Sequence, residues 1–220
     1  MTSIFAHRGA SAAAPENTVE AFLAAKAMGA DGVELDVRRH QSGMLAVAHD
    51  EVLGTDLAPS VPDLATALDA CEGMTVNVEI KNWKGDGDHD PGEELAERVV
   101  ALLHERRGRD DVLVSSFSLA TIGRVRALDP SIPTGFLVMI APDPDVAGRA
   151  LQRCREGGHV ALHPHHSAVT PQLVELCHAA GVAVNTWTVD DPDRMRELAD
   201  LGVDCLITNV PDLAKTVLGT

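Results

Sequence analysis

The chain of 220 residues contains few aromatic side chains and no tyrosine. Aromatic residues make up only 3% of the sequence, whereas hydrophobic residues together make up 45%. The core therefore has to consist mainly of Ala, Val and Leu, which let helices pack close to strands. The length is sufficient for one sizeable core, and we expect residues 1–220 to form a single domain.

Basic residues are scarce: 18 Lys and Arg stand against 33 Asp and Glu, which gives a formal net charge of −15. Such a surface argues against nucleic acid and against anionic membranes as partners. A small anionic molecule would need a locally positive site, made by a bound cation or by a few placed Arg and Lys side chains. The composition leaves open whether the chain forms a homo-oligomer.

Closely spaced cysteines and long apolar segments are also missing, and we expect no leader peptide. The four cysteines are too far apart in sequence for a CxxC motif, so we expect four buried thiols in a reducing compartment. The N-terminus leads directly into a predicted strand, without the basic and apolar segments of a signal peptide. No apolar run approaches the ~20 residues of a membrane span. We therefore expect a cytoplasmic protein with no stable membrane anchor.

Short apolar segments alternate with longer amphipathic ones along almost the whole chain. Most short segments are rich in Val, Ile and Leu without strict alternation, which is typical of strands buried on both faces. The predicted strands are 3–7, 32–38, 45–49, 75–80, 111–116, 133–139, 159–163, 182–187 and 203–208. The predicted helices are 17–28, 62–71, 93–106, 118–128, 143–155, 170–180, 191–200 and 210–218.

Repeated strand–helix units imply parallel strands joined by right-handed crossovers, and eight such units close a barrel. We therefore predict an α/β protein with a single (β/α)₈ barrel; an open doubly wound sheet is the alternative. The additional strand at 45–49 is expected to form a hairpin with the strand before it. The Gly- and Asp-rich segment 84–90 follows the third barrel strand, so we expect it to lie over the carboxyl ends of the strands. Ser118, Thr170 and Asp191 are predicted helix caps.

Three carboxylates interrupt or end the predicted strands, where they are costly to bury. Glu34 and Asp36 are separated by one residue and therefore point to the same face of their strand, and Glu79 lies on the next barrel strand. Clustered carboxylates repel one another unless a cation or protons intervene, and an all-oxygen site suits Mg²⁺ or Ca²⁺. In the alternative interpretation, each carboxylate pairs with a nearby base such as Arg38 or Lys81.

Two histidines, His7 and His49, end different strands and are expected at the same rim of the barrel. A pair of imidazoles can serve as general base and general acid near neutral pH. Arg8 and Lys81 are well placed to hold phosphate oxygens, Arg by its fork geometry and Lys as a point charge. The combination indicates acid–base chemistry on a phosphate ester.

Several motifs carry a resemblance to a known family: His7-Arg8-Gly9, Pro15-Glu16-Asn17-Thr18, Glu34-x-Asp36, His49-Asp50, Glu79-Ile80-Lys81, Trp187-Thr188-Val189 and Ile207-Thr208-Asn209. Taken together, and over essentially the whole chain, they resemble the glycerophosphodiester phosphodiesterase family. Any one of these motifs alone would be weak evidence. Their combination in this order is highly specific.

The resemblance implies a TIM barrel and a divalent metal, Mg²⁺ or Ca²⁺, held by Glu34, Asp36 and Glu79. It also implies hydrolysis of glycerophosphodiesters to an alcohol and glycerol 3-phosphate. The implied acid–base pair is His7 and His49; we take His7 as base and His49 as acid, although the sequence does not order them.

Further binding residues follow from the resemblance and from position. Arg8 and Lys81 are implied as phosphate contacts, and Glu16 and Asn17 lie at the rim in similar enzymes. Asn17 is open to two interpretations, a helix cap or a rim ligand. The remaining candidate binding residues are Ser116 as a polar wall, Phe117 as an apolar wall, His163 facing the site, and Trp187.

The chain departs from the family pattern at two places. The insertion that family members usually carry after the second strand is much shortened and is represented only by residues 51–61. The lobe that helps cover the glycerol end is therefore expected to be largely missing, which leaves the head group open. Asn209 stands where many members have Asp. Because this position only supports the site, we expect the change from Asp to Asn to have a modest effect.

Three alternatives remain open at this point. The sequence His163-Pro164-His165-His166 would suit a second, transition-metal site, although solvated His165 and His166 are the simpler expectation. A lysophospholipase D-like enzyme would need an aromatic-rich mouth, which two Trp and four Phe supply poorly. A non-catalytic phosphodiester-binding barrel is disfavoured because every catalytic position of the motif is filled.

Overall fold

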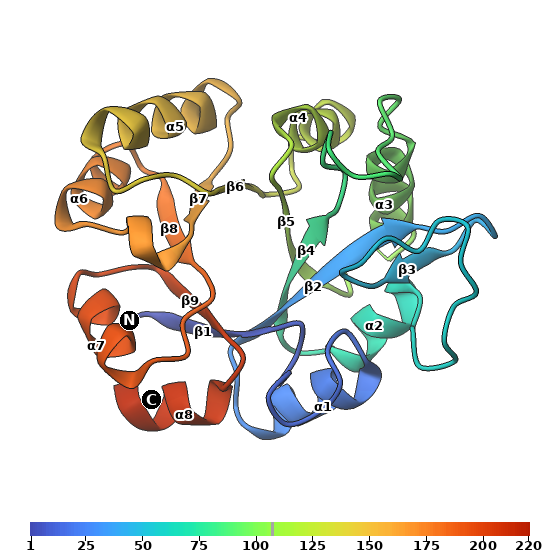
Figure 1. Cartoon of the computed structure of the whole chain (residues 1–220), viewed down its shortest axis with the longest axis horizontal. Helices are drawn as coiled ribbons and strands as arrows, with labels where there is room; N and C mark the ends of the chain where they lie inside the picture. The colour runs from blue at the N-terminus through green and yellow to red at the C-terminus, as the bar shows by residue number, and fades with distance from the viewer. Residues whose placement is uncertain (107) are drawn as a thin grey trace.

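In the computed structural model, which describes residues 1–106 and 108–220, eight parallel strands close into a barrel and eight α-helices surround it (Figure 1). The pairing of β1 with both β9 and β2 closes the sheet, which confirms the predicted (β/α)₈ fold and rules out an open sheet. The strands are β1 (Ser3–His7), β2 (Gly32–Arg39), β3 (Leu45–Val47), β4 (Thr75–Ile80), β5 (Asp111–Ser116), β6 (Thr134–Val138), β7 (Ala161–Pro164), β8 (Ala183–Thr186) and β9 (Cys205–Thr208). The helices are α1 (Val19–Ala27), α2 (Leu64–Ala70), α3 (Glu94–Glu105), α4 (Leu119–Leu128), α5 (Pro144–Glu156), α6 (Pro171–Ala179), α7 (Pro192–Asp200) and α8 (Pro211–Leu218).

The strand register places the chemically important side chains next to one another. In the parallel pair β1–β2, His7 lies beside Glu34, and in the pair β2–β4, Asp36 lies beside Glu79. Because successive side chains of a strand point to opposite faces, Glu34 and Asp36 share the barrel interior. Three strands therefore present these groups at one end of the barrel.

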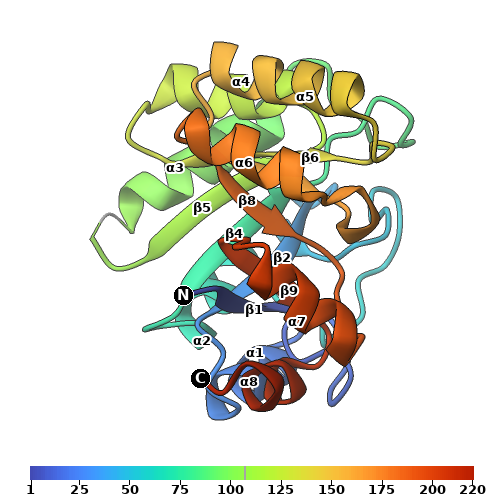
Figure 2. The ribbon, with the colours of Figure 1, turned by 90° about the vertical axis from the view of Figure 1, so that its left-hand side faces the viewer.

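Small aliphatic side chains fill the space between the strands and the helices, as the composition predicts. The buried residues are dominated by Ala, Val and Leu, and they form two clusters, one on each side of the barrel. In Figure 2, helices α5, α6, α7 and α8 lie over the strands on one side. The expected caps are confirmed: the side chains of Ser118, Thr170 and Asp191 each accept a hydrogen bond from a first-turn amide.

The connection after the second barrel strand is short, as expected. Strand β3 pairs antiparallel with β2 as the predicted hairpin, and residues 48–63 between β3 and α2 form no helix or strand, although Asp63 makes a single bridge to Ala46. The carbonyl of Thr55 lies 2.9 Å from His40 Nε2 and accepts a 2.9 Å hydrogen bond from Gln41, so the hairpin turn holds this connection.

Two expectations about the whole chain can be compared with the structure. The four cysteines, Cys71, Cys154, Cys177 and Cys205, are buried and unpaired, as expected. Among the described residues, no helix combines the length and the apolar character that crossing a bilayer requires.

Candidate active site

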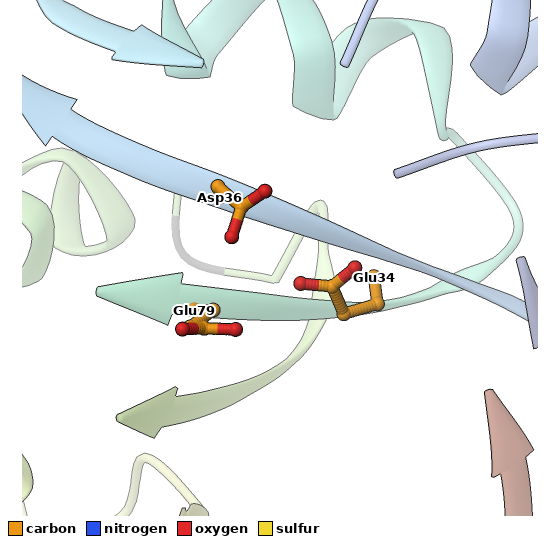
Figure 3. A group of neighbouring side chains, drawn as sticks. All are labelled: Glu34, Asp36 and Glu79. Carbon is orange, nitrogen blue, oxygen red and sulfur yellow. The ribbon is translucent and has the colours of Figure 1, made fainter. Parts of the chain in front are cut away.

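Three buried carboxylates meet at the carboxyl end of the barrel (Figure 3). Glu34 and Asp36 come from β2 and Glu79 comes from β4, and each offers an oxygen within 4.8 Å of those of the other two. Glu34 Oε1 is fully buried and has no hydrogen-bond partner in the described part of the chain. A buried oxygen without a partner is costly unless something binds it, and three carboxylate oxygens are the donor set of a hard divalent cation. The residues therefore fit Mg²⁺ or Ca²⁺.

Two basic side chains, Lys81 and Arg8, lie among these acids and neutralise part of their charge. Lys81 Nζ lies 2.9 Å from Glu79 Oε1 and 3.4 Å from Asp36 Oδ1. Arg8 Nε lies 3.2 Å from Asp36 Oδ2. Three carboxylates face two basic side chains, one of which also binds Glu16, so at least one negative charge is left without compensation, which favours a further positive charge at this place.

Arg38, the other base expected to pair with the acids, lies elsewhere. Its guanidinium binds Asp88 at 2.7 Å and Asp86 at 3.0 Å, and its Nε donates to the carbonyl of His49 at 2.7 Å. Arg38 therefore fastens the segment 84–90 near His49 and leaves the carboxylates to Arg8 and Lys81. The expectation that this segment lies at the active end of the barrel is met.

The pKa values of the three carboxyl groups shift in different directions, although burial acts to raise all of them. Burial raises the pKa of Glu34 well above its ordinary value, and the nearby negative charges of Asp36 and Glu79 add to this. Burial and Asp36 together raise the pKa of Glu79 to about 7. Burial also acts to raise the pKa of Asp36, but Lys81, Arg8 and the Asn17 amide outweigh it and hold that pKa below its usual range. Asp36 is therefore the most firmly ionised of the three.

Asn17 positions Asp36 and does not cap the helix, so the interpretation as a cap is wrong. Its amide nitrogen donates to Asp36 Oδ2 at 2.9 Å, and its Oδ1 accepts from the Asp36 backbone N–H at 3.2 Å. The cap of α1 is Thr18, whose side chain accepts from the Ala21 N–H. Asn17 has a φ of 57°, a left-handed conformation that Asn tolerates better than most residues.

The conformation of the loop after β1 explains the His7-Arg8-Gly9 motif. Gly9 has a φ of 82°, and a Cβ there would lie 2.6 Å from the backbone of Ala21. The N–H of Arg8, itself at a φ of 56°, donates to Glu34 Oε2 at 3.1 Å. The Arg8 guanidinium binds both carboxylate oxygens of Glu16, at 2.9 and 3.0 Å.

A chain of hydrogen bonds fixes the tautomer of His7. Asn209 donates its amide N–H to Asp190 at 2.6 Å, so its Oδ1 points to His7 Nδ1, 2.7 Å away. Because this oxygen is only an acceptor, Nδ1 carries the proton and the lone pair of neutral His7 is on Nε2. Nε2 lies 3.9 Å from Glu34. Burial lowers the pKa of His7, although the bond to Asn209 opposes the shift.

His49 is held by a different arrangement. Its Nδ1 lies 2.8 Å from the carboxylate of the adjacent Asp50. This carboxylate accepts a hydrogen bond from Nδ1–H, so Nε2 is the ring nitrogen that remains available to the cavity. Both histidines line one cavity of about 240 Å³. Other predicted site residues that line it are Arg8, Glu34, Glu79, Lys81, Phe117 and Trp187. Sequence motifs spread over the whole chain thus meet at one cavity.

A larger cavity of about 660 Å³ adjoins the first one. The two share five lining residues: His49, Glu79, Lys81, Phe117 and Leu137. Phe117 stands in the middle, with its ring 6.0 Å from that of Trp83 and 5.6 Å from that of Trp187. Ser116 lines only the larger cavity, and its buried hydroxyl donates to the carbonyl of Ile80.

The histidines of the 163–166 segment are not brought to the catalytic cavity. His163 is fully buried in the barrel, where its Nε2 lies 3.0 Å from the Asn185 amide nitrogen, and burial lowers its pKa to about 3. His165 and His166 are half-buried and keep part of the solvent contact expected of them, while His165 packs against Trp187 with ring centroids 5.2 Å apart. Among the described residues, the acidic triad is the one cluster with metal-ligand geometry, so the alternative of a histidine metal site receives no support.

Sequence reasoning missed Asn77, which also lines the catalytic cavity. Both of its side-chain polar atoms are buried without a partner in the described part of the chain. Asn77 precedes Glu79 by two residues, so the alternation that identified Glu34 with Asp36 places it on the same face. Leu137 and Ile207 also line this cavity, and nothing in the sequence distinguishes them from core residues.

Comparisons with known proteins show which family the chain is similar to. Residues 7–57 and 54–213 match the model of the Glycerophosphoryl diester phosphodiesterase family. The glycerophosphodiester phosphodiesterase of Caldanaerobacter subterraneus subsp. tengcongensis is 30% identical, over 96% of this chain and 95% of its own. That of Bacillus altitudinis is also 30% identical, over 99% and 98%. A phosphodiesterase from Oleispira antarctica, solved in complex with the product sn-glycerol-3-phosphate, superposes with a TM-score of 0.87 at 25% identity, over 100% of this chain and 98% of that one.

Proposed function

The chain belongs to the glycerophosphoryl diester phosphodiesterase family, and from this premise we propose that it hydrolyses glycerophosphodiesters to an alcohol and glycerol 3-phosphate. We assign this activity to a single domain spanning residues 1–220. The observation that carries the proposal is that His7 and His49 line one cavity together with Glu34 and Glu79, two members of the acidic triad that Asp36 completes.

The donor set of Glu34, Asp36 and Glu79 fits Mg²⁺ or Ca²⁺. A cation bound there would supply positive charge that polarises the phosphoryl oxygens. Lys81 and Arg8 border the same carboxylates, so their charges face the phosphate as well. They stabilise the negative charge that builds up on the phosphoryl oxygens during displacement.

The two histidines divide the proton transfers. His7 acts as the base: its Nε2 lone pair takes the proton of the attacking oxygen, while Asn209 keeps the ring in the required tautomer. The lowered pKa of His7 keeps this ring neutral near pH 7. His49 acts as the acid: in the doubly protonated ring that this step requires, Nδ1–H is held by Asp50 and Nε2–H gives its proton to the oxygen of the leaving alcohol, on the side where the two cavities meet.

The remaining predicted residues shape the site. Glu16 holds the Arg8 guanidinium by two hydrogen bonds, and Asn17 fixes the Asp36 carboxylate. Phe117 and Trp187 form an apolar wall of the catalytic cavity. We assign no contact with substrate to His163, because it is buried in the barrel beside Asn185.

The test is hydrolysis of glycerophosphocholine by the wild-type protein with Mg²⁺, with Ca²⁺ and with excess EDTA. We expect activity with one of the cations and none with EDTA. His7→Ala and His49→Ala are each expected to lose at least ~10²-fold in turnover, the lower end of general acid–base contributions. His104→Ala, on the outer face of α3, is the matched control. Full turnover in EDTA, or losses under ~10-fold in both histidine variants, would contradict the proposal.

A further inference from the structure

The cavity of about 660 Å³ beside the catalytic one has largely apolar walls. Strand β6, the segment that follows it and helix α5 contribute Phe136, Val138, Met139, Ile140 and Val146. The volume is that of a site for a small-molecule ligand. The cavity opens onto the catalytic residues, because His49, Glu79 and Lys81 line both spaces.

Aromatic side chains gather at this cavity, although the chain has few of them. Of its two Trp and four Phe, Trp83, Phe117 and Phe136 line the larger cavity. Trp83 is 53% exposed and Met139 is 66% exposed, so large apolar groups form the mouth. Contiguous exposed apolar surface marks a binding site more often than chance exposure does. The composition alone suggested too few aromatic side chains for such a mouth. The fold nevertheless brings three of the six aromatic side chains to this one cavity.

Two arginines of α5, Arg149 and Arg153, also line the larger cavity. They are one helical turn apart and exposed, and neither forms an ion pair with an acid of the described residues. Arg38, which lines the same cavity, is by contrast neutralised by Asp86 and Asp88. In a chain with a net charge of −15, two unpaired guanidinium groups at one cavity indicate an anionic ligand.

We propose, on the basis of the phosphodiesterase function given above, that this cavity accepts the leaving alcohol of the substrate and that this alcohol is an anionic amphiphile. Its apolar part lies against Trp83, Phe136 and Ile140, and a terminal carboxylate or phosphate binds Arg149 and Arg153. The substrate class is therefore a glycerophosphodiester with an apolar arm that ends in a second negative charge.

The position of His49 decides which arm enters the larger cavity. In the displacement, a new P–O bond forms to the attacking oxygen, whose proton passes to His7. The P–O bond to the arm breaks, and the departing oxygen takes a proton from His49. Because His49 lines both cavities, the oxygen that it protonates lies at their junction and the rest of the arm extends toward α5.

The test compares two synthetic glycerol phosphodiesters of equal length, one with a hydroxyoctanoate arm and one with an octanediol arm. We expect kcat/KM to be at least ~10-fold higher for the carboxylate-ended arm, the effect of one or two charge-assisted hydrogen bonds. The double variant Arg149→Ala, Arg153→Ala is expected to lose this preference. Arg155→Ala, which removes an exposed arginine of α5 that does not line the cavity, is expected to keep it. Equal kcat/KM values in the wild type, or a preference that survives the double variant, would overturn the inference.

A binding measurement separates this inference from the proposed function. Trp187→Phe leaves Trp83, at the cavity mouth, as the one tryptophan of the chain. Titration of this variant with octanoate is expected to give a saturable change in Trp83 emission, weakened at least ~10-fold when Arg149 and Arg153 are also replaced by Ala. Saturable binding to this variant, with no hydrolysis of glycerophosphocholine by the wild-type protein, would refute the catalytic proposal alone. Hydrolysis by the wild-type protein, with no octanoate binding to the variant or with binding indifferent to the arginines, would refute the cavity assignment alone.

Discussion

Replacing Glu79 by Gln is expected to stabilise the cation-free protein while abolishing its stabilisation by Mg²⁺ or Ca²⁺. Burial and the charge of Asp36 raise the pKa of the Glu79 carboxyl from 4.5 to about 7. Between these values the native state binds more protons than the unfolded state, so the free energy of unfolding falls as the pH rises through this range. The shift corresponds to about 3 kcal/mol at pH values above 7.

The Glu79→Gln variant cannot ionise at this position, so its free energy of unfolding should not fall as the pH rises through this range. Its gain at about pH 8 is at most about 3 kcal/mol, since Gln gives up the charge-assisted bond from Lys81 to the Glu79 carboxylate. A bound cation offsets the same repulsion in the wild type: at one hundred times its Kd it adds about 2.7 kcal/mol. For a chain of this size that is a rise in Tm of roughly 5–10 °C.

Thermal unfolding in EDTA and in excess Mg²⁺ or Ca²⁺, at about pH 5 and about pH 8, measures both effects. In EDTA, Glu79→Gln should unfold at a higher temperature than the wild type at the higher pH, and the difference should shrink or reverse at the lower pH. Glu175→Gln, an exposed substitution on α6, serves as the matched control and should follow the wild type. If Glu79→Gln is no more stable than the wild type in EDTA at the higher pH and still gains on adding a cation, the carboxylates are not the cation site.

Three further predictions concern single side chains. Asn209→Ala removes the hydrogen bond that raises the pKa of His7, so the acid limb of the kcat/KM profile should move to lower pH while kcat falls ~10–100-fold; a limb that moves upward would contradict the assignment of His7 as base. Asn17→Ala leaves Asp36 without two hydrogen bonds and should cost about 1–3 kcal/mol in urea unfolding, besides weakening cation affinity in calorimetry; an unchanged urea midpoint would show that Asn17 does not support the carboxylate. Burial, with the charge of Arg126 adding, lowers the pKa of His159 to about 4, so the native state binds fewer protons than the unfolded state below the ordinary value of 6.5. Stability should therefore fall by about 2 kcal/mol between pH 7 and pH 5, and His159→Gln should flatten this dependence in denaturant titrations; an equally steep slope in the variant would assign it to other groups.

Much of the fold could be predicted from the sequence because the relevant signals are local. Apolar runs and caps such as Thr170 and Asp191 give the order of strands and helices, and the number of units gives the barrel. The carboxylate cluster was predictable for the same reason: strand alternation puts Glu34 and Asp36 on one face, and parallel order brings Glu79 next to them.

The tertiary structure decided everything that depends on contacts between distant segments. Asn17 was undetermined in sequence because its partner, Asp36, lies on another element. The tautomer of His7 depends on Asn209, near the other end of the chain, and the true partners of Arg38 lie in the 84–90 segment.

The larger cavity was invisible in the sequence for the same reason. Trp83 follows β4, whereas Phe136 and Arg149 belong to β6 and α5 of a different strand–helix unit, and each alone reads as an ordinary loop, core or surface residue. Periodicity and spacing report how a residue relates to its neighbours along the chain. The closure of the barrel is what brings the ends of all its strands to one rim, and only that closure determines which side chains share a cavity there.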